Sequence, residues 1–220
     1  MNWLNLFLLS TIFIASSCSK AYTVEGNNNL TPINGKTAYL KQYSNGLWQV
    51  LDSASINHSK YKLEGKVNKP PLLATLFIDD IAITPIVLEA GLIKVDLNKA
   101  DLLIQGTALN NKLNKFYQSK YNLDIKLINA LQQNQGDDII QYIVRANEQL
   151  IKDFAIDNKS NILGPTILSV YHNSYPNLSK CDDIKPLFDS PFFFIKNDLN
   201  FPSFDSEDVI EFSLIDFIIR

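Results

Sequence analysis

The chain has 220 residues, of which 46% are hydrophobic and 20% are charged, a composition that can build a packed core and excludes a wholly disordered chain. Its net charge of −3 argues against nucleic acid as a partner, because nucleic-acid-binding proteins present a basic face to the phosphates. Arginine occurs only at Arg145 and Arg220, so bidentate phosphate contacts are scarce as well.

The first 18 residues have the pattern of an export signal. An almost wholly apolar run from Trp3 to Ala15 is followed by two serines and Cys18, as in bacterial lipoproteins, where the peptide is cleaved before the cysteine and the thiol is acylated. The run of about 13 residues is shorter than the roughly 20 of a membrane-spanning helix, which disfavours an uncleaved anchor. The sequence therefore predicts a signal peptide over residues 1–17 and a lipid on Cys18.

Residues 18–107 show the pattern of a β-domain. The residues from Lys60 to Val67 alternate apolar and charged side chains, which indicates a strand with one buried face. Asn45 and Gly46 between two apolar runs predict a hairpin. We expect about eight strands from Tyr22 to Gly106, in an antiparallel β-sandwich or a barrel-like domain. The individual strands that we expect cover residues 35–43, 47–51, 60–67, 72–78, 81–88, 93–97 and 102–105.

Residues 108–176 are expected to be helical. Apolar residues recur at spacings of three and four from Leu109 to Leu131, and Gly136 ends this helix. Asp137 and Asp138 would supply the cap and the first-turn charge of a second helix. A third helix is expected to start near Pro165 and to run to about residue 175.

Residues 177–220 have no sustained period, so we expect an irregular C-terminal segment, with the truncated start of a further domain as the alternative. Phe and Ile are frequent from Phe192 to Ile219. Because exposed apolar surface is costly, this part should either dock on the preceding helices or associate with a partner or a second copy.

No pattern of catalytic or metal-binding residues is found. His58 lies in an expected turn and His172 on the third helix, with no second ligand at zinc spacing. The acidic pairs at residues 79–80 and 137–138 are explained by a turn and a helix start. Once Cys18 carries lipid, Cys181 is the single remaining thiol; it is followed by two aspartates, and the chain has no Cys-x-x-Cys motif.

We therefore expect a protein that is not an enzyme and that has no catalytic, cofactor-binding or metal-binding residues. The expected strands carry five aromatic residues for which a carbohydrate- or peptide-binding face is the functional interpretation, and core or cross-strand packing the default one. These residues are Tyr39, Tyr43, Trp48, Tyr61 and Phe77.

Five short motifs, in this order, resemble a known family: 35–40 (GKTAYL), 51–54 (LDSA), 61–65 (YKLEG), 87–91 (VLEAG) and 106–110 (GTALN). The chain resembles, from about residue 22 to 117, an N-terminal β-domain of unknown function found in exported lipoproteins of Bacteroidota, ahead of thioredoxin-like domains of the AhpC/TSA or TlpA type. In that family the redox chemistry belongs to the thioredoxin-like domain, which is absent here. The resemblance thus carries no catalytic residue over to this chain.

Together these features predict a lipid-anchored cell-envelope protein that acts as a non-catalytic binding or interaction module. The alternative is an accessory or truncated member of the thiol–disulfide oxidoreductase lipoprotein family without its catalytic domain. The expected partners are the membrane, through the lipid, and an envelope protein or small ligand, but not nucleic acid. The protein would be anchored to the inner or outer membrane, facing the periplasm or the cell surface.

The lipid-anchor hypothesis predicts the effect of Cys18→Ala. This change removes the thiol that is acylated, so the variant should accumulate as uncleaved precursor without lipid. Intact-mass analysis of the membrane fraction should find the wild-type chain starting at acylated Cys18. A wild-type mass equal to that of the unmodified 220-residue chain would contradict the hypothesis.

Overall fold

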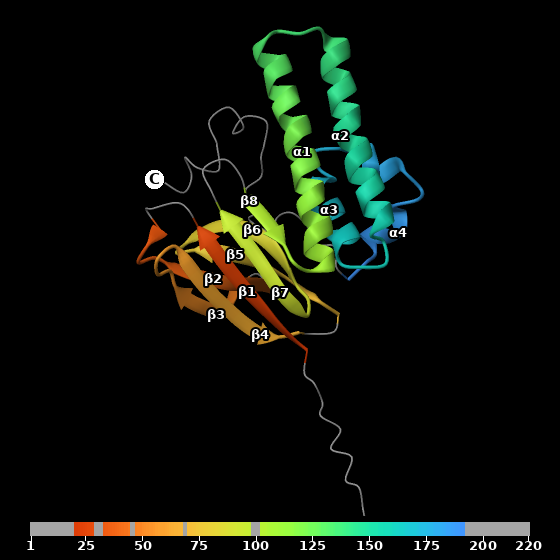
Figure 1. Ribbon diagram of the computed structural model, residues 1–220. Coiled ribbons are helices and arrows are strands. Elements are labelled where there is room, and N and C mark those ends of the chain that lie inside the picture. The colour runs from red at the N-terminus through yellow and green to blue at the C-terminus, as the bar shows by residue number, and fades with distance from the viewer. Residues whose placement is uncertain (1–19, 29–32, 45–46, 68–69, 98–101, 192–220) are drawn as a thin grey trace, which may run out of the picture.

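Two four-stranded sheets pack face to face, and a group of helices lies at one side of them in this computed structural model (Figure 1). The structure describes residues 20–28, 33–44, 47–67, 70–97 and 102–191. The strand orders are β4-β1-β7-β8 and β3-β2-β5-β6. The strands are β1 Ala21–Asn28, β2 Thr37–Ser44, β3 Leu47–Ser55, β4 Lys60–Lys66, β5 Leu72–Ile78, β6 Ile81–Leu88, β7 Gly91–Leu97 and β8 Leu102–Gln105. The predicted sandwich followed by helices is confirmed, and the sheets do not close into a barrel.

Strand β1 departs from the antiparallel expectation. It lies inside its sheet, antiparallel to β4 but parallel to β7, with Val24 opposite Leu63 on one side and Ile93 on the other. The other pairs within the sheets are antiparallel. Two parallel strands cannot be joined by a tight turn, so the sequence between β1 and β7 holds no turn signal from which their pairing could be predicted.

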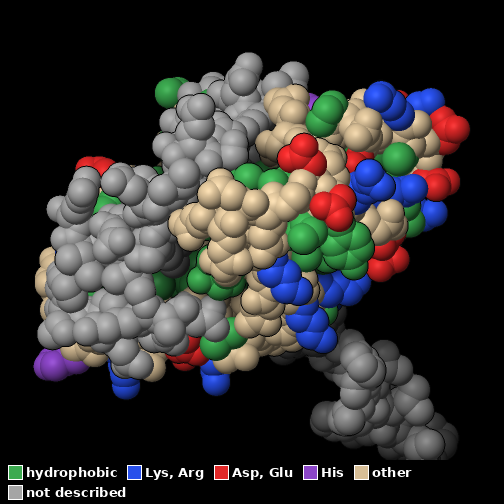
Figure 2. All heavy atoms as spheres, turned by 90° about the horizontal axis from the view of Figure 1, so that it is seen from above, with side chains coloured by type: hydrophobic (Ala, Val, Ile, Leu, Met, Phe, Trp, Pro, Cys, Tyr) green, Lys and Arg blue, Asp and Glu red, His purple; other side chains and the backbone are tan. Residues whose placement is uncertain are grey.

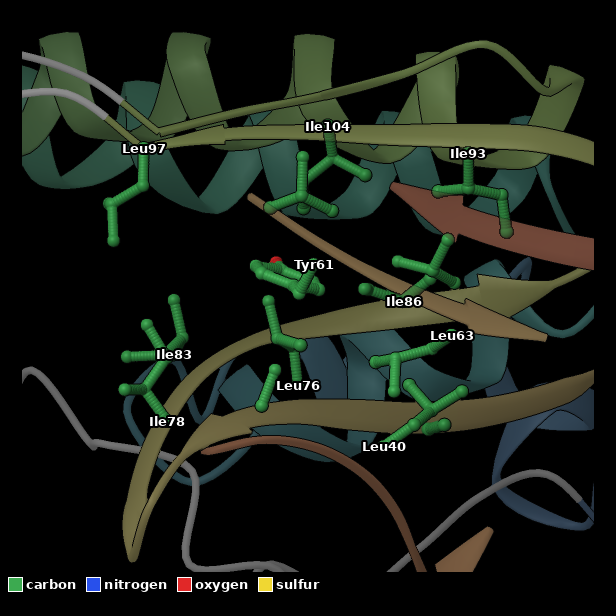
Figure 3. Packing of buried hydrophobic residues seen from close by; sticks show 14 of the residues in the cluster. Leu40, Tyr61, Leu63, Leu76, Ile78, Ile83, Ile86, Ile93, Leu97 and Ile104 are labelled. Atoms are coloured by element: carbon green, nitrogen blue, oxygen red, sulfur yellow. The ribbon is translucent and has the colours of Figure 1, made fainter. Parts of the chain in front are cut away.

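The main core fills the space between the sheets. Figure 3 shows Leu40 and Leu76 of one sheet facing Leu63, Ile93 and Ile104 of the other. All five side chains are almost completely buried. The neighbours of Leu40, Leu63, Ile93 and Ile104 along their strands are exposed or half-buried, as the period of two predicts, whereas β5 is buried on both sides of Leu76.

Two tyrosines of this core each lie over a glycine of the neighbouring strand. Tyr61 of β4 is opposite Gly26 of β1, and Tyr22 of β1 is opposite Gly65 of β4. A Cβ atom on either glycine would collide with the tyrosine ring, so glycine makes room for the ring at both positions. The Tyr61 hydroxyl is buried without a hydrogen-bond partner, and burial raises the pKa of Tyr61.

The helices form a second core of their own. Leu113 and Phe116 of the first helix pack with Ile151 of the second and Ile167 of the third. None of the helices within the described ranges is long and apolar enough to cross a bilayer. The helices are α1 Ala108–Gln132, α2 Asp137–Asp157, α3 Leu163–Tyr171 and α4 Lys185–Phe188, with a 3-10 turn at Leu178–Lys180 between α3 and α4.

Two predictions about helix ends need correction. The N-cap of α2 is Gly136 in extended conformation, without a side-chain hydrogen bond, so Asp137 and Asp138 supply first-turn charge but no cap. Helix α3 starts at Leu163 and ends at Tyr171, four residues before the expected end, because the chain then turns and the backbone N–H of Tyr175 donates to Tyr171.

The first turns of α1 join the helix to both sheets. The Asn110 side chain accepts a hydrogen bond from the Val87 N–H of β6 (3.0 Å) and donates one to the Val87 carbonyl (2.7 Å). Asn114 accepts from the Ile104 N–H of β8 (3.1 Å). The Glu89 carboxylate accepts from the Leu109 N–H at the start of the helix (2.6 Å). Helix α1 therefore covers one edge strand of each sheet, β6 and β8.

Replacing Asn110 should be among the costliest changes outside the apolar cores. Asn110→Ala leaves the buried N–H and carbonyl of Val87 without partners, at about 1–3 kcal/mol each. We expect the free energy of unfolding in urea to fall by about 2–5 kcal/mol. The exposed Asn122→Ala of the same helix is the matched control and should change stability by less than about 0.5 kcal/mol. Equal effects of the two changes would contradict this role of Asn110.

Candidate functional site

One half of the outer face of the β3-β2-β5-β6 sheet is not covered by the helices. On the β6 side, Val87 and Leu73 point outward and pack into the helical core. On the β2 and β3 side the helical core contributes no residue. On the β2 and β3 side, the outward side chains of the sheet are therefore not packed against the helices.

Aromatic side chains and a lysine gather on this uncovered half. Ala38 and Leu40 of β2 point into the core, so Tyr39, Lys41 and Tyr43 point outward by the period of two. Cross-strand pairing then sets Trp48 of β3 opposite Tyr43, and Phe77 of β5 opposite Tyr39. We call these five residues, Tyr39, Lys41, Tyr43, Trp48 and Phe77, the aromatic–lysine face.

Three of the four rings of the aromatic–lysine face are in contact with one another, through Trp48. Trp48 meets Tyr43 edge-to-face with centroids 5.2 Å apart, and Phe77 in the same manner at 5.0 Å. Such pairs contribute about 0.5–1.5 kcal/mol beyond the area that they bury. Phe77 is only 6% exposed and forms the centre, while Tyr39, Tyr43 and Trp48 remain half-buried around it.

The charge on this face belongs to Lys41. Its Nζ lies 4.3 Å from the ring centroid of Phe77 and 5.0 Å from that of Tyr39. No carboxylate among the described residues lies within ion-pair distance of Lys41, whereas the nearby Lys36 has Asp79 at 3.7 Å. Cation–π contacts at a partly open site contribute about 0.5–1 kcal/mol, less than a buried ionic partner would. Lys41 is thus placed to receive an anionic group beside apolar surface.

Strand β3 extends the apolar surface of this site. Val50 is 55% exposed and is opposite Lys41 on the same outward side. Leu47, which is 70% exposed, is opposite Ser44 and therefore belongs to the other side of the strand. The arrangement provides stacking surface, apolar contact and one cation, with no nucleophile or acid–base pair among these residues.

The structure brings together four of the five aromatic residues that the sequence suggested for a binding face. Tyr61 is the exception, because β4 belongs to the other sheet and directs its ring into the core. Lys41 and Val50 were missed. The signal for Lys41 was present in the sequence, since it lies between Tyr39 and Tyr43 at the same strand parity.

The other residues considered from the sequence do not meet one another. His58 is exposed in a turn at positive φ, as predicted. Asp79, also at positive φ, accepts the Thr37 N–H (2.9 Å) in the β5–β6 turn. His172 contacts the Ser169 carbonyl and the Phe188 ring, and Cys181 is a half-buried free thiol.

Within the described ranges, no group of three or more His, Cys, Asp or Glu side chains is arranged to hold a metal ion. Cys18 and the segment from Phe192 to Ile219 lie outside the described residues, so the predictions made for them remain predictions.

A second polar cluster, which the sequence did not suggest, lies among the helices. Lys120 is 7% exposed, and its Nζ donates to both Asp124 oxygens at 2.5 and 2.7 Å. The same Nζ lies 5.2 Å from the ring centroid of Tyr171 and 5.9 Å from that of Tyr175. Its signal was a Lys and an Asp four residues apart within the apolar stripe of α1. The carboxylate and the rings surround the ammonium, so we interpret this cluster as structural.

Burial shifts the titration of this cluster. Desolvation raises the pKa of Asp124, and the attraction of Lys120 offsets only part of that shift. Burial also raises the pKa of Tyr171 well above its usual value, with further increments from Tyr117 and Asp124. Folding therefore favours the protonated, neutral forms of Asp124 and Tyr171 relative to the unfolded chain.

Comparison with known proteins finds one family model that matches part of the chain. The model of a domain of unknown function (DUF4369) matches residues 22–113. No curated protein and no solved structure matches the chain. The matched residues run from β1 through the sandwich into the first turns of α1, and so they include both the aromatic–lysine face and Asn110. No catalytic family is identified.

The raised pKa of Asp124 predicts a pH dependence of stability. Because the folded-state pKa lies above the unfolded one, ionised Asp124 costs stability near neutral pH, and this cost disappears as the pH falls through the folded-state pKa. The stability of the wild type relative to Asp124→Asn should therefore increase on acidification from neutral pH. Urea unfolding of both chains at a series of pH values measures this difference, and a decrease on acidification would contradict the assignment.

Proposed function

We propose that this protein is a lipid-anchored cell-envelope protein that acts as a non-catalytic binding or interaction module, with the aromatic–lysine face as its contact surface. The observation that carries the proposal is the group of four aromatic rings, two of them in contact with Lys41, on the half of the sheet that the helices leave uncovered. Buried aromatic and cationic residues of this kind dominate the energetics of many protein interfaces.

The proposed anchor would lie close to the folded sandwich. Ala21 begins β1 and is the third residue after Cys18, so a lipidated Cys18 would stay within about 10 Å of the start of that strand. Figure 1 places the start of β1 and the turn between α1 and α2 at opposite ends of the molecule. The membrane would then lie at the β1 end, and the helical hairpin would point away from it.

We also propose that the chain is related to the Bacteroidota lipoproteins whose β-domain precedes a thioredoxin-like domain. Support comes from the family match over residues 22–113, which covers all five motifs that carried this resemblance. The alternative within this proposal is an accessory or truncated member of the thiol–disulfide oxidoreductase lipoproteins. A frameshifted thioredoxin-like sequence directly downstream in the genome would favour truncation, and an unrelated gene there would favour the stand-alone module.

The chemistry of the face indicates its ligand. Aromatic rings and Val50 favour apolar or ring-shaped groups, and an ammonium without a carboxylate partner among the described residues favours an anion. We therefore propose a partner that presents an apolar or aromatic group next to a negatively charged one, such as an acidic peptide segment or an anionic glycan of the envelope.

Tryptophan fluorescence tests this proposal. The two tryptophans are Trp3 and Trp48, so a chain cleaved before Cys18 retains Trp48 alone, and its emission reports directly on the face. Titration with a panel of acidic aromatic peptides and anionic glycans should change the emission saturably for at least one of them. Lys41→Ala should weaken that binding by about 10- to 150-fold, because a charge-assisted contact contributes about 1.5–3 kcal/mol.

The control for this experiment is Lys94→Ala, an exposed lysine on β7 of the other sheet, which should leave the affinity unchanged. Binding that is equally strong in both lysine variants and does not alter Trp48 emission would place the site elsewhere on the protein.

A further inference from the structure

The four edge strands of the two sheets differ in how they are protected from pairing with another chain. Strand β4 alternates outward charges along its length, with Lys60, Lys62, Glu64 and Lys66 all exposed. Strand β6 carries Pro85 and is held by Asn110 of α1. Strand β8 has only four residues and is bonded to Asn114 of α1. Charges, proline, shortness and a covering helix are the usual means of blocking an edge.

Strand β3 has none of these protections over its first half. The residues from Leu47 to Leu51 carry no charge and no proline. Leu47, Val50 and Leu51 are 70%, 55% and 37% exposed. Among the described residues, β3 pairs only with β2, so the other side of this half-strand keeps its backbone groups unpaired. An exposed apolar edge strand of this kind is a template for a further strand.

The second half of β3, from Asp52 onward, lies beside β4 and is not open to another strand, so the open edge is limited to the first half. The Asp52 carboxylate accepts the Glu64 N–H of β4 (2.7 Å) and the Ser53 N–H (2.8 Å), so β4 lies beside this half. The register between β2 and β3 shifts at Leu40 and Lys41, which leaves Leu51 as the extra residue of a bulge. A bulge bends its strand and ends regular pairing. The open edge is therefore the five-residue segment from Leu47 to Leu51.

We propose that this segment pairs antiparallel with the same segment of a second copy of the chain. An antiparallel pair of identical strands has two-fold symmetry, so each copy offers the surface that the other needs. A two-fold axis at Gln49 would set Leu47 opposite Leu51 of the other copy and Trp48 opposite Val50. Because the segment is uncharged, no like charges meet across the axis, in contrast to the lysine-rich edge of β4.

This pairing would have a consequence for the binding surface. The two β3-β2-β5-β6 sheets would join into one sheet of eight strands, with β3 of each copy at its centre. Trp48 of both copies would then lie near the axis, and the two aromatic–lysine faces would form one surface. The inference does not depend on what that surface binds, so it can fail while the proposed function holds.

Sedimentation velocity over a dilution series of the purified full chain tests the pairing. The wild type should show a concentration-dependent dimer. Val50→Lys places two additional cations beside the axis and should give monomer at every concentration. Leu92→Lys, at an exposed apolar position of β7 inside the other sheet, should dimerise as the wild type does. A wild type that stays monomeric, or a Val50→Lys chain that still dimerises, would overturn the proposal.

Cross-linking tests the register, in chains that carry Cys18→Ser and Cys181→Ser. Residues at the axis of an antiparallel pair have Cα atoms about 4.5–5.5 Å apart, within the range of a disulfide. A Gln49→Cys chain should therefore form a covalent dimer on oxidation. A Lys62→Cys chain, changed on the charged edge of β4, should not. A cross-link from Lys62→Cys without one from Gln49→Cys would place the contact on a different edge and refute the assignment, as would pairing of Gln49→Cys with an unrelated protein.

Discussion

The contact between Asn110 and Val87 is the constraint on which the rest of the structure depends. One fully buried amide side chain satisfies both the N–H and the carbonyl of Val87 on an edge strand, and its Nδ2 also donates to Thr107 Oγ1 (2.8 Å). Such a side chain tolerates little displacement, because any shift leaves buried polar groups unpaired. It therefore determines where α1 crosses the sandwich, and Asn114 then brings the same helix to β8.

The position of α1 determines which outer surfaces of the sandwich the helices cover and which can contact a partner. The helices cover the outer side of β6 and part of β5, where Val87 and Leu73 join the helical core. The helices do not cover β2 and β3, which carry the aromatic–lysine face and the open edge from Leu47 to Leu51. Figure 2, seen from the end at which α1 and α2 meet, also shows hydrophobic side chains between charged ones on the helices. On α1 and α2 the exposed Tyr121 and Tyr142 make no ring contact with another described residue, unlike the rings of the face on β2 and β3.

The strands and helices were largely predictable because their signals are local. The expected bounds of β5, β6 and β8 agree with the structure, since Pro71, the turn at residues 79–80 and Gly106 delimit them. The site was predictable only in part. Strand parity shows that Tyr39 and Tyr43 share a face, but not whether that face is core or surface. For Tyr61 the default expectation of core packing is confirmed. The parallel β1–β7 pair depends on contacts between distant segments, which no local pattern encodes. The spacing of Lys120 and Asp124 is a local signal, but the packing of Lys120 against Tyr171 and Tyr175 depends on distant segments as well.

Hydrogen–deuterium exchange on the chain in its native membrane, compared with the purified chain diluted to monomer, tests most directly whether β2 and β3 form the contact surface. The account predicts slower exchange in the native membrane for peptides covering Tyr39–Tyr43 and Leu47–Leu51, because a partner or second copy protects those amides. Exchange in β4 and β7 should be the same in both samples. Unchanged exchange in β2 and β3, together with protection at the hairpin end of α1 and α2, would contradict the account.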